Sequence, residues 1–220
     1  MDITSYLLGK NAGGGSGSGG LDWSAIGYAS QPKSILDDYN YSKNIYDNWD
    51  ATQTSLENKF KNNYVLTYMP AVDTSNITNM MGCFYGCYSL NTIPMLDTSK
   101  VTNMKDMFNG CYKIKEIPLF DTSRATAMNT MFNNCQNLET IPQFNLGSVS
   151  TVNSMLSNCI SLTDQSLDNV LKMCININPN YSRTKTLAQI GFNATNYPTS
   201  RIEALPHYQD FINAGWTIGY

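Results

Sequence analysis

A unit of 24 residues repeats along the middle of the chain, and this period constrains the fold more than any other feature. Prolines and cysteines both recur at this interval: Pro70, Pro94, Pro118 and Pro142, and Cys87, Cys111, Cys135 and Cys159. A fixed period of roughly 20 to 50 residues is typical of stacked arrays, in which each unit buries its apolar edge against its neighbours. The period therefore predicts a stack of units, an architecture that binds or supports more often than it catalyses.

The pattern inside one unit predicts a helix, a turn and a short strand. Apolar residues fall at steps of three or four, the spacing of a single helix face: Val101, Met104, Met107, Phe108, Cys111 and Ile114. Asp97, Thr98 and Ser99 precede this run and supply helix-capping chemistry, while Ile93 and Pro94 predict a short irregular strand. We therefore expect an α/β fold, a short solenoid of helix–turn–strand units with a helical N-terminal cap and a mixed C-terminal cap.

The composition along the chain predicts where the stack begins and ends. Residues 21–66 are rich in aromatic side chains and end in a degenerate first repeat, so we expect an N-terminal cap there. Residues 67–162 hold the regular units, and residues 163–220 are expected to form the C-terminal cap. A terminal helix within this cap is predicted from the spacing of Leu167, Val170, Leu171 and Cys174.

Two short segments precede the N-terminal cap. Residues 1–11 form an amphiphilic peptide, and residues 12–20 are a run of glycine and serine with one alanine, which makes a flexible tether. We interpret the first segment as a docking peptide that binds through Ile3, Tyr6, Leu7 and Leu8. The alternative is a disordered tail or an expression linker.

Composition and charge exclude several classes of partner. Charged residues make up 14% of the chain and the formal net charge is −3, so no basic surface is expected for nucleic acid. No apolar stretch approaches the length of a membrane span, and residues 1–10 lack the pattern of a signal peptide. We expect a protein that is made in the cytoplasm and left there, or carried out within a larger assembly, and that has neither a nucleic-acid partner nor a membrane partner.

The repeated cysteines have two interpretations. A disulfide framework is one, but a single cysteine at the same place in each repeat favours a column of reduced, inward-facing thiols. A metal site would need more ligands, and the one histidine, His207, lies far along the chain and is expected to be an exposed cap residue. We expect no metal and no cofactor.

Residues that could carry catalysis are scarce in this sequence. Asp73, Asp97 and Asp121 also recur once per repeat, and turn formation explains them better than a ladder of calcium ions. Nucleophilic catalysis normally needs a base close to the nucleophile, and a single histidine leaves little room for it. We therefore expect no catalytic residues and no enzymatic activity.

One column of side chains is a candidate ligand face. Tyr64, Tyr88 and Tyr112 are equivalent across the repeats. Tyrosine combines a rigid apolar ring with a hydroxyl, which suits sugars and protein surfaces. A neighbouring column varies in charge, as a recognition surface would: Asn91, Lys115 and Glu139. The alternative is an ordinary polar surface.

The repeats resemble the leucine-rich repeats of the BspA-like type, including the variant found in mycoplasma surface lipoproteins. The resemblance rests on residues 96–111, with shorter matches at 72–80 and 120–124, and it covers about residues 56–174. It implies a leucine-rich-repeat solenoid. Proteins of this type include adhesins and other surface proteins, which implies a binding function.

The N-terminus resembles the start of virion structural proteins from phages and prophages of gut Firmicutes. Residues 2–10 and the glycine tract carry this resemblance, and residues 186–220 are similar to the ends of repeat proteins from the same genomes. It implies a non-enzymatic virion decoration or fibre protein, located in the virion and displaying its repeats for adhesion. The expected partners are other virion proteins, a host surface protein or glycan, and further copies of the chain, in particular as a trimer. The alternative is a bacterial BspA-like surface or effector module that binds proteins.

Overall fold

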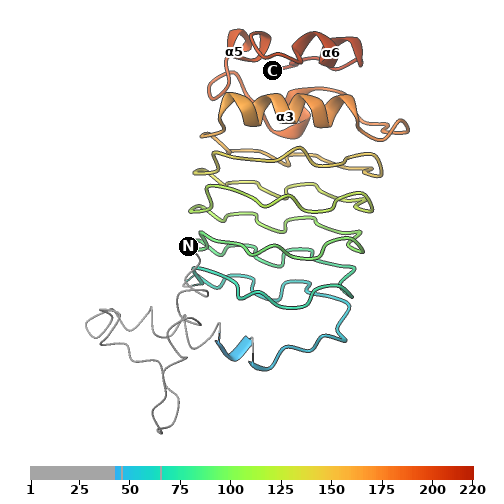
Figure 1. Cartoon of the computed structure of the whole chain (residues 1–220). Helices are drawn as coiled ribbons and strands as arrows, with labels where there is room; N and C mark the ends of the chain where they lie inside the picture. The colour runs from blue at the N-terminus through green and yellow to red at the C-terminus, as the bar shows by residue number, and fades with distance from the viewer. Residues whose placement is uncertain (1–42, 46, 65) are drawn as a thin grey trace, which may run out of the picture.

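The computed structural model describes residues 43–45, 47–64 and 66–220. From residue 54 onward the backbone runs in coils of 24 residues that lie one on another, with helices at the C-terminal end (Figure 1). We number these coils 1 to 5 by their first residues, which are Thr54, Thr78, Thr102, Thr126 and Ser150. The hydroxyl at the start of coils 2 to 5 donates to the carbonyl of the equivalent residue one coil earlier, at 2.9–3.2 Å.

Backbone hydrogen bonds join neighbouring coils along what we call the first ladder. Parallel bridges link equivalent residues in all five coils: Ser55, Asn79, Asn103, Ala127 and Thr151. Beyond this bridge, every second amide donates to the next coil, as Phe84 N does to Met107 O at 2.8 Å. The amides in between close turns within their own coil, as Cys83 N does to Met80 O at 3.1 Å. Turn and ladder therefore share the backbone donors, and few remain unpaired.

This alternation depends on two left-handed residues in every coil, four positions apart. They have φ between 53° and 79°: Asn58, Asn62, Gly82, Gly86, Asp106, Gly110, Thr130, Asn134, Ser154 and Asn158. Glycine, asparagine and aspartate tolerate this conformation best, and they occupy eight of the ten positions. Thr130 and Ser154 are the exceptions.

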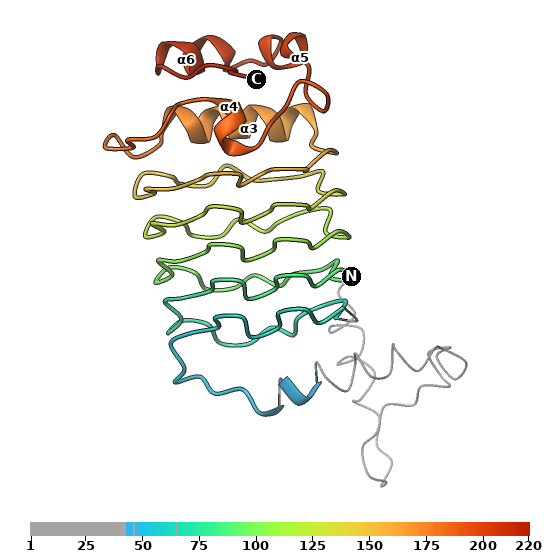
Figure 2. The ribbon, with the colours of Figure 1, turned by 180° about the vertical axis from the view of Figure 1, so that it is seen from behind.

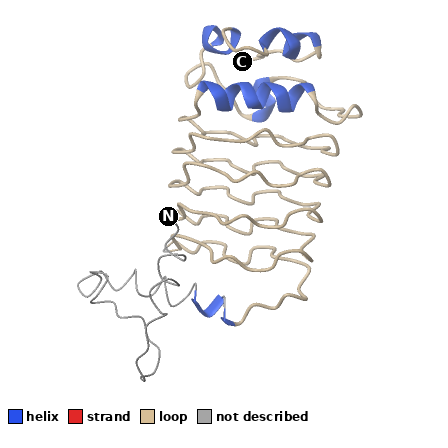
Figure 3. Ribbon diagram, in the orientation of Figure 1, coloured by secondary structure: helices blue, strands red, loops and turns tan. Residues whose placement is uncertain are grey.

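The expected unit of helix, turn and short strand is wrong for these coils. Among the described residues from 48 to 163 there is no helix, and extended pairing is confined to isolated bridges, as Figure 3 shows. The apolar run that suggested a helix forms successive turns, in which Met107 N bonds Met104 O and Cys111 N bonds Phe108 O. A left-handed residue at Asp106 and another at Gly110 are incompatible with a helix through this segment.

The interior of the stack is built from columns of identical side chains. In coils 1 to 4, one phenylalanine per coil stacks on the next, with ring centroids 5.2–5.8 Å apart: Phe60, Phe84, Phe108 and Phe132. Leu156 takes this position in coil 5. A buried threonine in each of coils 1 to 3 donates to the next coil, as Thr98 Oγ1 does to Asp121 O at 3.0 Å. Because each coil presents the same edge to its neighbour, one set of side chains fills every layer.

The four repeated cysteines confirm the prediction of an inward-facing thiol column. Each is buried and reduced, and its Sγ donates to a phenylalanine carbonyl of the preceding coil at 3.0–3.1 Å. Burial raises the pKa of every one of these thiols, to about 12 for Cys87 and Cys159. They are packing groups rather than reactive ones.

Four helices cover the C-terminal end of the stack. The predicted terminal helix is confirmed as α3 (Asp164–Ile175), which lies on coil 5, and α4 (Leu187–Ile190) lies beside it (Figure 2). A second layer holds α5 (Thr199–Glu203) and α6 (Tyr208–Asn213), and α6 contacts α3. None of the helices in the described part of the chain is long and apolar enough to cross a membrane.

Helix α4 takes the place of a further coil on the first ladder. Its carbonyls at Gln189 and Ile190 accept the amides of Ser154 and Leu156 at 2.8 and 2.9 Å. The chain then turns at Gly191, which has φ of 112°. A Cβ at this residue would lie 2.5 Å from Ser157 N, so only glycine fits. The cap thus satisfies donors that the last coil would otherwise expose.

The N-terminal predictions lie mostly outside the described residues. Ile3, Tyr6, Leu7 and Leu8 belong to this part of the chain, as does the tether at 12–20. Of the expected N-terminal cap, residues 43–45 and 47 are helical. Trp49 Nε1 donates to Asp73 O at 2.7 Å, which joins this segment to coil 1.

Candidate functional site

The three tyrosines of the predicted ligand face lie side by side on the outside of coils 1 to 3. Tyr64, Tyr88 and Tyr112 have exposed fractions of 52%, 42% and 36%. Their ring centroids are 4.8 Å apart between the first pair and 4.9 Å between the second. Partial desolvation and the two neighbouring phenols raise the pKa of Tyr88, so its hydroxyl stays protonated near neutral pH. The structure therefore brings these three residues together as one exposed stack.

Stacking decides which part of each ring a ligand can reach. The planes of Tyr64 and Tyr88 are inclined by 25°, so each ring covers a face of the other. Tyr88 is covered in this way on both sides, because Tyr112 follows at an inclination of 32°. What the stack offers outward is ring edges and hydroxyl groups, which contact a ligand by hydrogen bonding.

The polar column of the predicted face lines a hollow of about 700 Å³ on the surface of coils 2 to 4. Asn91, Lys115 and Glu139 all contribute to it, and Lys115 Nζ pairs with Glu139 Oε1 at 3.2 Å. The sequence did not single out the other lining residues: Lys113, Glu116, Asn137 and Thr140. They could have been found by following positions 113, 116, 137 and 140 as outward neighbours of the same column.

The hollow adjoins the tyrosine stack through the backbone. Asn137 Nδ2, on the wall of the hollow, donates to Tyr112 O at 2.7 Å, and Lys113 follows Tyr112 in the chain. The six residues of the predicted ligand face thus lie in one region of the stack. We call the hollow and the tyrosine stack together the outer strip.

The repeated aspartates act as turn residues. Asp73, Asp97 and Asp121 each accept the backbone amide two residues ahead, at 2.9–3.0 Å. The hydroxyl and amide of Ser99 lower the pKa of Asp97, and Ser75 and Ser123 do the same for their aspartates. In the described part of the chain, no group of three or more histidine, cysteine, aspartate or glutamate side chains is placed to hold a metal ion.

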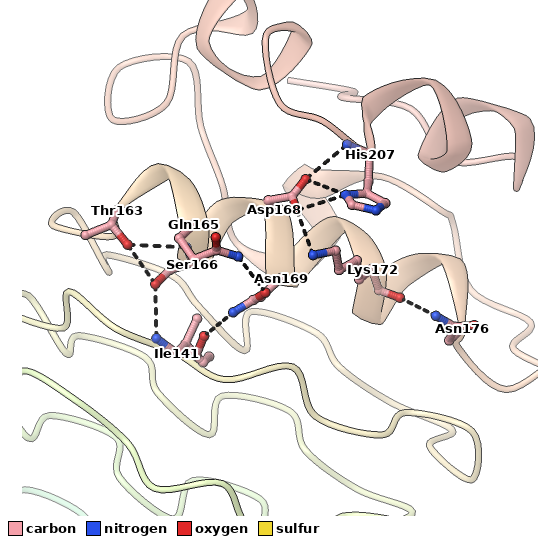
Figure 4. A network of polar contacts seen from close by, with 9 residues as sticks. All are labelled: Ile141, Thr163, Gln165, Ser166, Asp168, Asn169, Lys172, Asn176 and His207. Carbon is pink, nitrogen blue, oxygen red and sulfur yellow. Dashed lines mark hydrogen bonds and ion pairs between the residues drawn. The ribbon is translucent and has the colours of Figure 1, made fainter.

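A buried carboxylate lies between the two layers of the cap (Figure 4). The side chain of Asp168, on α3, is 6% exposed, and it accepts from Lys172 Nζ at 2.9 Å and from the backbone amide of His207 at 3.0 Å. The ring of His207 also contacts this carboxylate, with Nδ1 2.9 Å from Oδ2. Burial raises the pKa of Asp168, but the hydrogen bonds from Lys172 and His207 outweigh it, so the pKa lies below its ordinary value.

His207 is less free than the sequence suggested. Its side chain is 37% exposed, and its ring is held against Asp168 rather than projecting into solvent. Among the described residues, no hydroxyl or thiol forms a hydrogen bond with this ring. The pair joins the N-terminus of α6 to α3 and so fastens the outer layer of the cap.

Comparison with known proteins identifies the repeats and nothing outside them. Residues 54–170, more than half of the chain, match the family described as "Mycoplasma protein of unknown function, DUF285". No curated protein and no solved structure matches the chain. The match begins at coil 1 and ends inside α3, so it does not extend to residues 1–10. The family match therefore gives no support to the resemblance between those residues and phage proteins.

Proposed function

The chain belongs to the DUF285 family of mycoplasma-type repeat proteins, whose function is unknown, and from this premise we propose that it is a non-enzymatic binding module. Its coil stack, which we class as a leucine-rich-repeat solenoid of the BspA-like type, serves to present the outer strip to a ligand. The residues of the outer strip would contact this ligand directly.

The observation that carries this proposal is a contrast between inward and outward columns. Inward positions repeat almost without change, as the phenylalanine and cysteine columns do, because every layer must fit the next. The outward column that begins with the tyrosines continues as Gln136 and Ile160, and the polar column changes from amide to amine to carboxylate. Side chains that are exposed and differ from coil to coil are free to serve a ligand rather than the fold.

The arrangement of polar groups also favours binding over catalysis. The histidine and the buried carboxylate lie in the cap, where they fasten α6 to α3. The outer strip holds an ion pair, amides and phenols on an open surface, which can orient a ligand but offers no activated nucleophile.

For the biological setting we propose a virion decoration or fibre protein that adheres to host cells. The anchor would be the N-terminal peptide with Ile3, Tyr6, Leu7 and Leu8, and this part of the proposal rests on the sequence alone. The family match favours a second setting, a bacterial surface or effector module that binds a protein. In either setting the outer strip would face the partner.

Binding by the outer strip is tested by measuring how much of the purified full chain is retained on intact cells that share the environment of the source organism. We expect saturable retention on intact cells that falls at least fivefold in a Tyr88→Ala/Lys115→Ala variant. Lys100→Ala, which removes an exposed lysine bonded to Asn76 away from the strip, is the matched control and should bind normally. Retention that does not saturate, or that the strip variant leaves unchanged, would contradict the proposal.

The setting is tested separately on particles purified from a lysate. Mass spectrometry and immunogold labelling should find the chain in stoichiometric amount on a defined part of the virion. Recovery from the cell envelope, with none on particles, would instead identify the bacterial module. A fusion of residues 1–20 to a fluorescent protein tests the anchor, since capture of the fusion by particles is expected only if these residues dock.

A further inference from the structure

The hydrogen-bond ladder that joins the coils is interrupted at one place, directly under the outer strip. A second ladder runs beside the polar column, where Asn91 N donates to Thr67 O at 3.0 Å and Glu139 N donates to Lys115 O at 2.8 Å. Between these two levels, the equivalent bond from Lys115 N to Asn91 O is missing within the described part of the chain. The parallel bridges show the same interruption, because Tyr68 pairs with Thr92 and Glu116 pairs with Thr140, but Thr92 and Glu116 are not paired.

The interruption is local, since the first ladder continues through the same pair of coils. Gly82 N bonds Lys105 O at 2.8 Å, and Phe84 N and Gly86 N reach coil 3 at 2.8 and 2.7 Å. Coils 2 and 3 are therefore hydrogen-bonded along the first ladder, whereas the bond and the bridge of the second ladder are missing between them. Lys115 N and Asn91 O have no backbone partner among the described residues, and both residues are exposed, so water or a ligand can take the place of the missing partner.

Two hollows lie over this interruption. The larger, of about 700 Å³, and a smaller one of about 320 Å³ share Asn91 and Glu116, which are the residues on its two sides. The smaller hollow adds apolar surface from Ile93, Ile117 and Pro118. The two hollows adjoin through these shared residues, and we call them together the gap site.

The charges around the gap site cancel. Lys115 is paired with Glu139, and the remaining charged side chains are one lysine and one glutamate, Lys113 and Glu116. A site of this kind has no net field to attract an anion or a cation. It favours a ligand that is polar and uncharged.

The uncharged groups of the gap site are amides, hydroxyls and free backbone atoms. Asn91, Lys115 and Thr140 line the larger hollow, and Lys115 N–H and Asn91 C=O have no backbone partner among the described residues. The adjoining tyrosine stack offers hydroxyls and ring edges, and the ring of Tyr88 is covered by a neighbour on both faces. Most of these groups can both donate and accept, or come as a donor beside an acceptor, which matches a ligand that carries hydroxyl groups along its length.

We propose that the gap site binds a neutral glycan. The proposal rests on the binding function proposed above and specifies the class of ligand and its place. A protein partner fits less well, since the centre of a protein interface is usually apolar and aromatic, whereas here the two isoleucines are buried and the lining is polar.

The experiment uses the full chain, uniformly ¹⁵N-labelled, titrated with defined sugars. The neutral probes are maltohexaose, mannohexaose and lacto-N-tetraose, and the acidic probes are sialyllactose and a heparin hexasaccharide. We expect at least one neutral probe to shift the amide signals of Asn91, Lys115 and Glu116 first. Raising sodium chloride from about 50 to 500 mM should leave its affinity within twofold, because no charge is neutralised.

A Lys115→Ala/Glu139→Ala variant tests the site. It removes the pair without changing the net charge, and we expect at least a tenfold loss of affinity for the bound sugar. The matched control, Lys105→Ala/Glu57→Ala, removes one exposed lysine and one exposed glutamate elsewhere on the stack and should bind as the parent chain does. Thermal unfolding of both variants shows whether a loss of affinity reflects loss of the fold.

The outcomes separate this inference from the proposed function. Binding of a neutral sugar that the Lys115/Glu139 variant leaves unchanged would overturn the gap site. Binding of acidic probes only, with strong salt dependence, would overturn the neutral class. If no sugar binds while cells still retain the chain through the outer strip, a protein ligand replaces the glycan. If neither sugars nor cells bind, the proposed function fails with it.

Discussion

Thr130 is the residue whose backbone conformation suits its side chain least, and replacing it should stabilise the protein. It occupies the first left-handed position of coil 4 with φ of 56°, where the equivalent residue of coil 2 is Gly82. The left-handed conformation costs an L-residue about 1–2 kcal/mol, and a branched Cβ does nothing to relieve this. In addition, Thr130 Oγ1 is buried without a hydrogen-bond partner, which adds about 1–3 kcal/mol.

Thr130→Gly removes both penalties. Glycine offsets part of the gain, because its greater freedom in the unfolded chain costs about 0.5–1 kcal/mol, and the lost methyl group costs about 0.8 kcal/mol. The net expectation is an increase of about 1–2 kcal/mol in the free energy of unfolding. For a chain of this size, each kcal/mol should raise Tm by about 2–4 °C. Chemical denaturation followed by circular dichroism measures the free energy of unfolding, and a thermal melt followed in the same way measures Tm.

Thr130→Ala separates the two causes. Alanine removes the unpaired hydroxyl but keeps an L-residue in the left-handed conformation, so the Gly variant should exceed the Ala variant by about 0.5–1 kcal/mol. If the two variants are equally stable, or if Ala is the better one, the left-handed column does not store the strain argued here. Gly82→Ala is the reverse experiment. It should destabilise the chain, because the added Cβ would lie 2.4 Å from Asn58 Oδ1 in addition to adopting φ of 59°.

Three further predictions concern the cap and the titrating groups. Gly191→Ala should lower the free energy of unfolding by about 2–4 kcal/mol, because the added Cβ would meet the backbone of Ser157. Hydrogen exchange should become faster at the amides of Ser154 and Leu156, which donate to the carbonyls of α4. Unchanged exchange at these amides would contradict the role given to α4. Burial raises the pKa of the Cys159 thiol from 9.0 to about 12, so the contribution of this thiol to the free energy of unfolding is complete below pH 9 and is lost as the pH rises toward 12. By pH 10 the loss should be about 1.4 kcal/mol. Under reducing conditions a Cys159→Val variant should therefore lose less stability between pH 8 and 10 than the parent chain. The lowered pKa of Asp168 gives a pH dependence of the opposite sign, because the stability that this carboxylate contributes is present above its ordinary pKa of 3.8 and is lost as the pH falls below that value. Asp168→Asn should therefore flatten the decline of the free energy of unfolding between pH 5 and 3. An equally steep decline in the variant would show that this carboxylate does not determine acid stability.

The period and the buried columns could be predicted from the sequence because a stack needs the same side chain at the same place in every layer. Phe108, Met107 and Cys111 are buried as expected, and the thiol column is where its spacing put it. The local conformation could not be read from apolar spacing, since successive turns, each closed by a bond between residues three apart, place apolar side chains at steps of three and four as a helix does. A usable signal was present, however. In coils 1 to 3, Asn, Asp or Gly recurs four residues apart, as at Asp106 and Gly110, and such a pair inside an apolar run indicates left-handed turns rather than a helix.

The candidate site was partly accessible for the same reason. Asn91, Lys115 and Glu139 could be singled out because their column varies, and variation is visible in one sequence when the sequence repeats itself. The interruption of the second ladder was not accessible. Nothing in the sequence distinguishes the step from Asn91 to Lys115 from the step from Lys115 to Glu139, yet only the latter is bonded. Whether two coils pair at a given level depends on their relative position, which the whole stack determines.

The two ladders contribute unequally to the stability of the fold, and this difference explains why a site can form on only one of them. On the first ladder, each coil contributes alternate amides and two left-handed residues, and coils 2 to 5 add a thiol that bonds back to the previous coil, so an interruption there would expose several polar groups at once. The second ladder contributes at most three bonds between neighbouring coils on an exposed surface, where water replaces a lost partner at small cost. Coils 2 and 3 can therefore separate beside Asn91 without endangering the stack. The outward columns next to the second ladder can vary for the same reason, so the variable residues and the unpaired backbone atoms meet on the same side of the molecule. A repeat protein of this construction would gain binding sites wherever its weaker ladder is interrupted, and inserting a coil between coils 2 and 3 should move the gap site while leaving the first ladder intact.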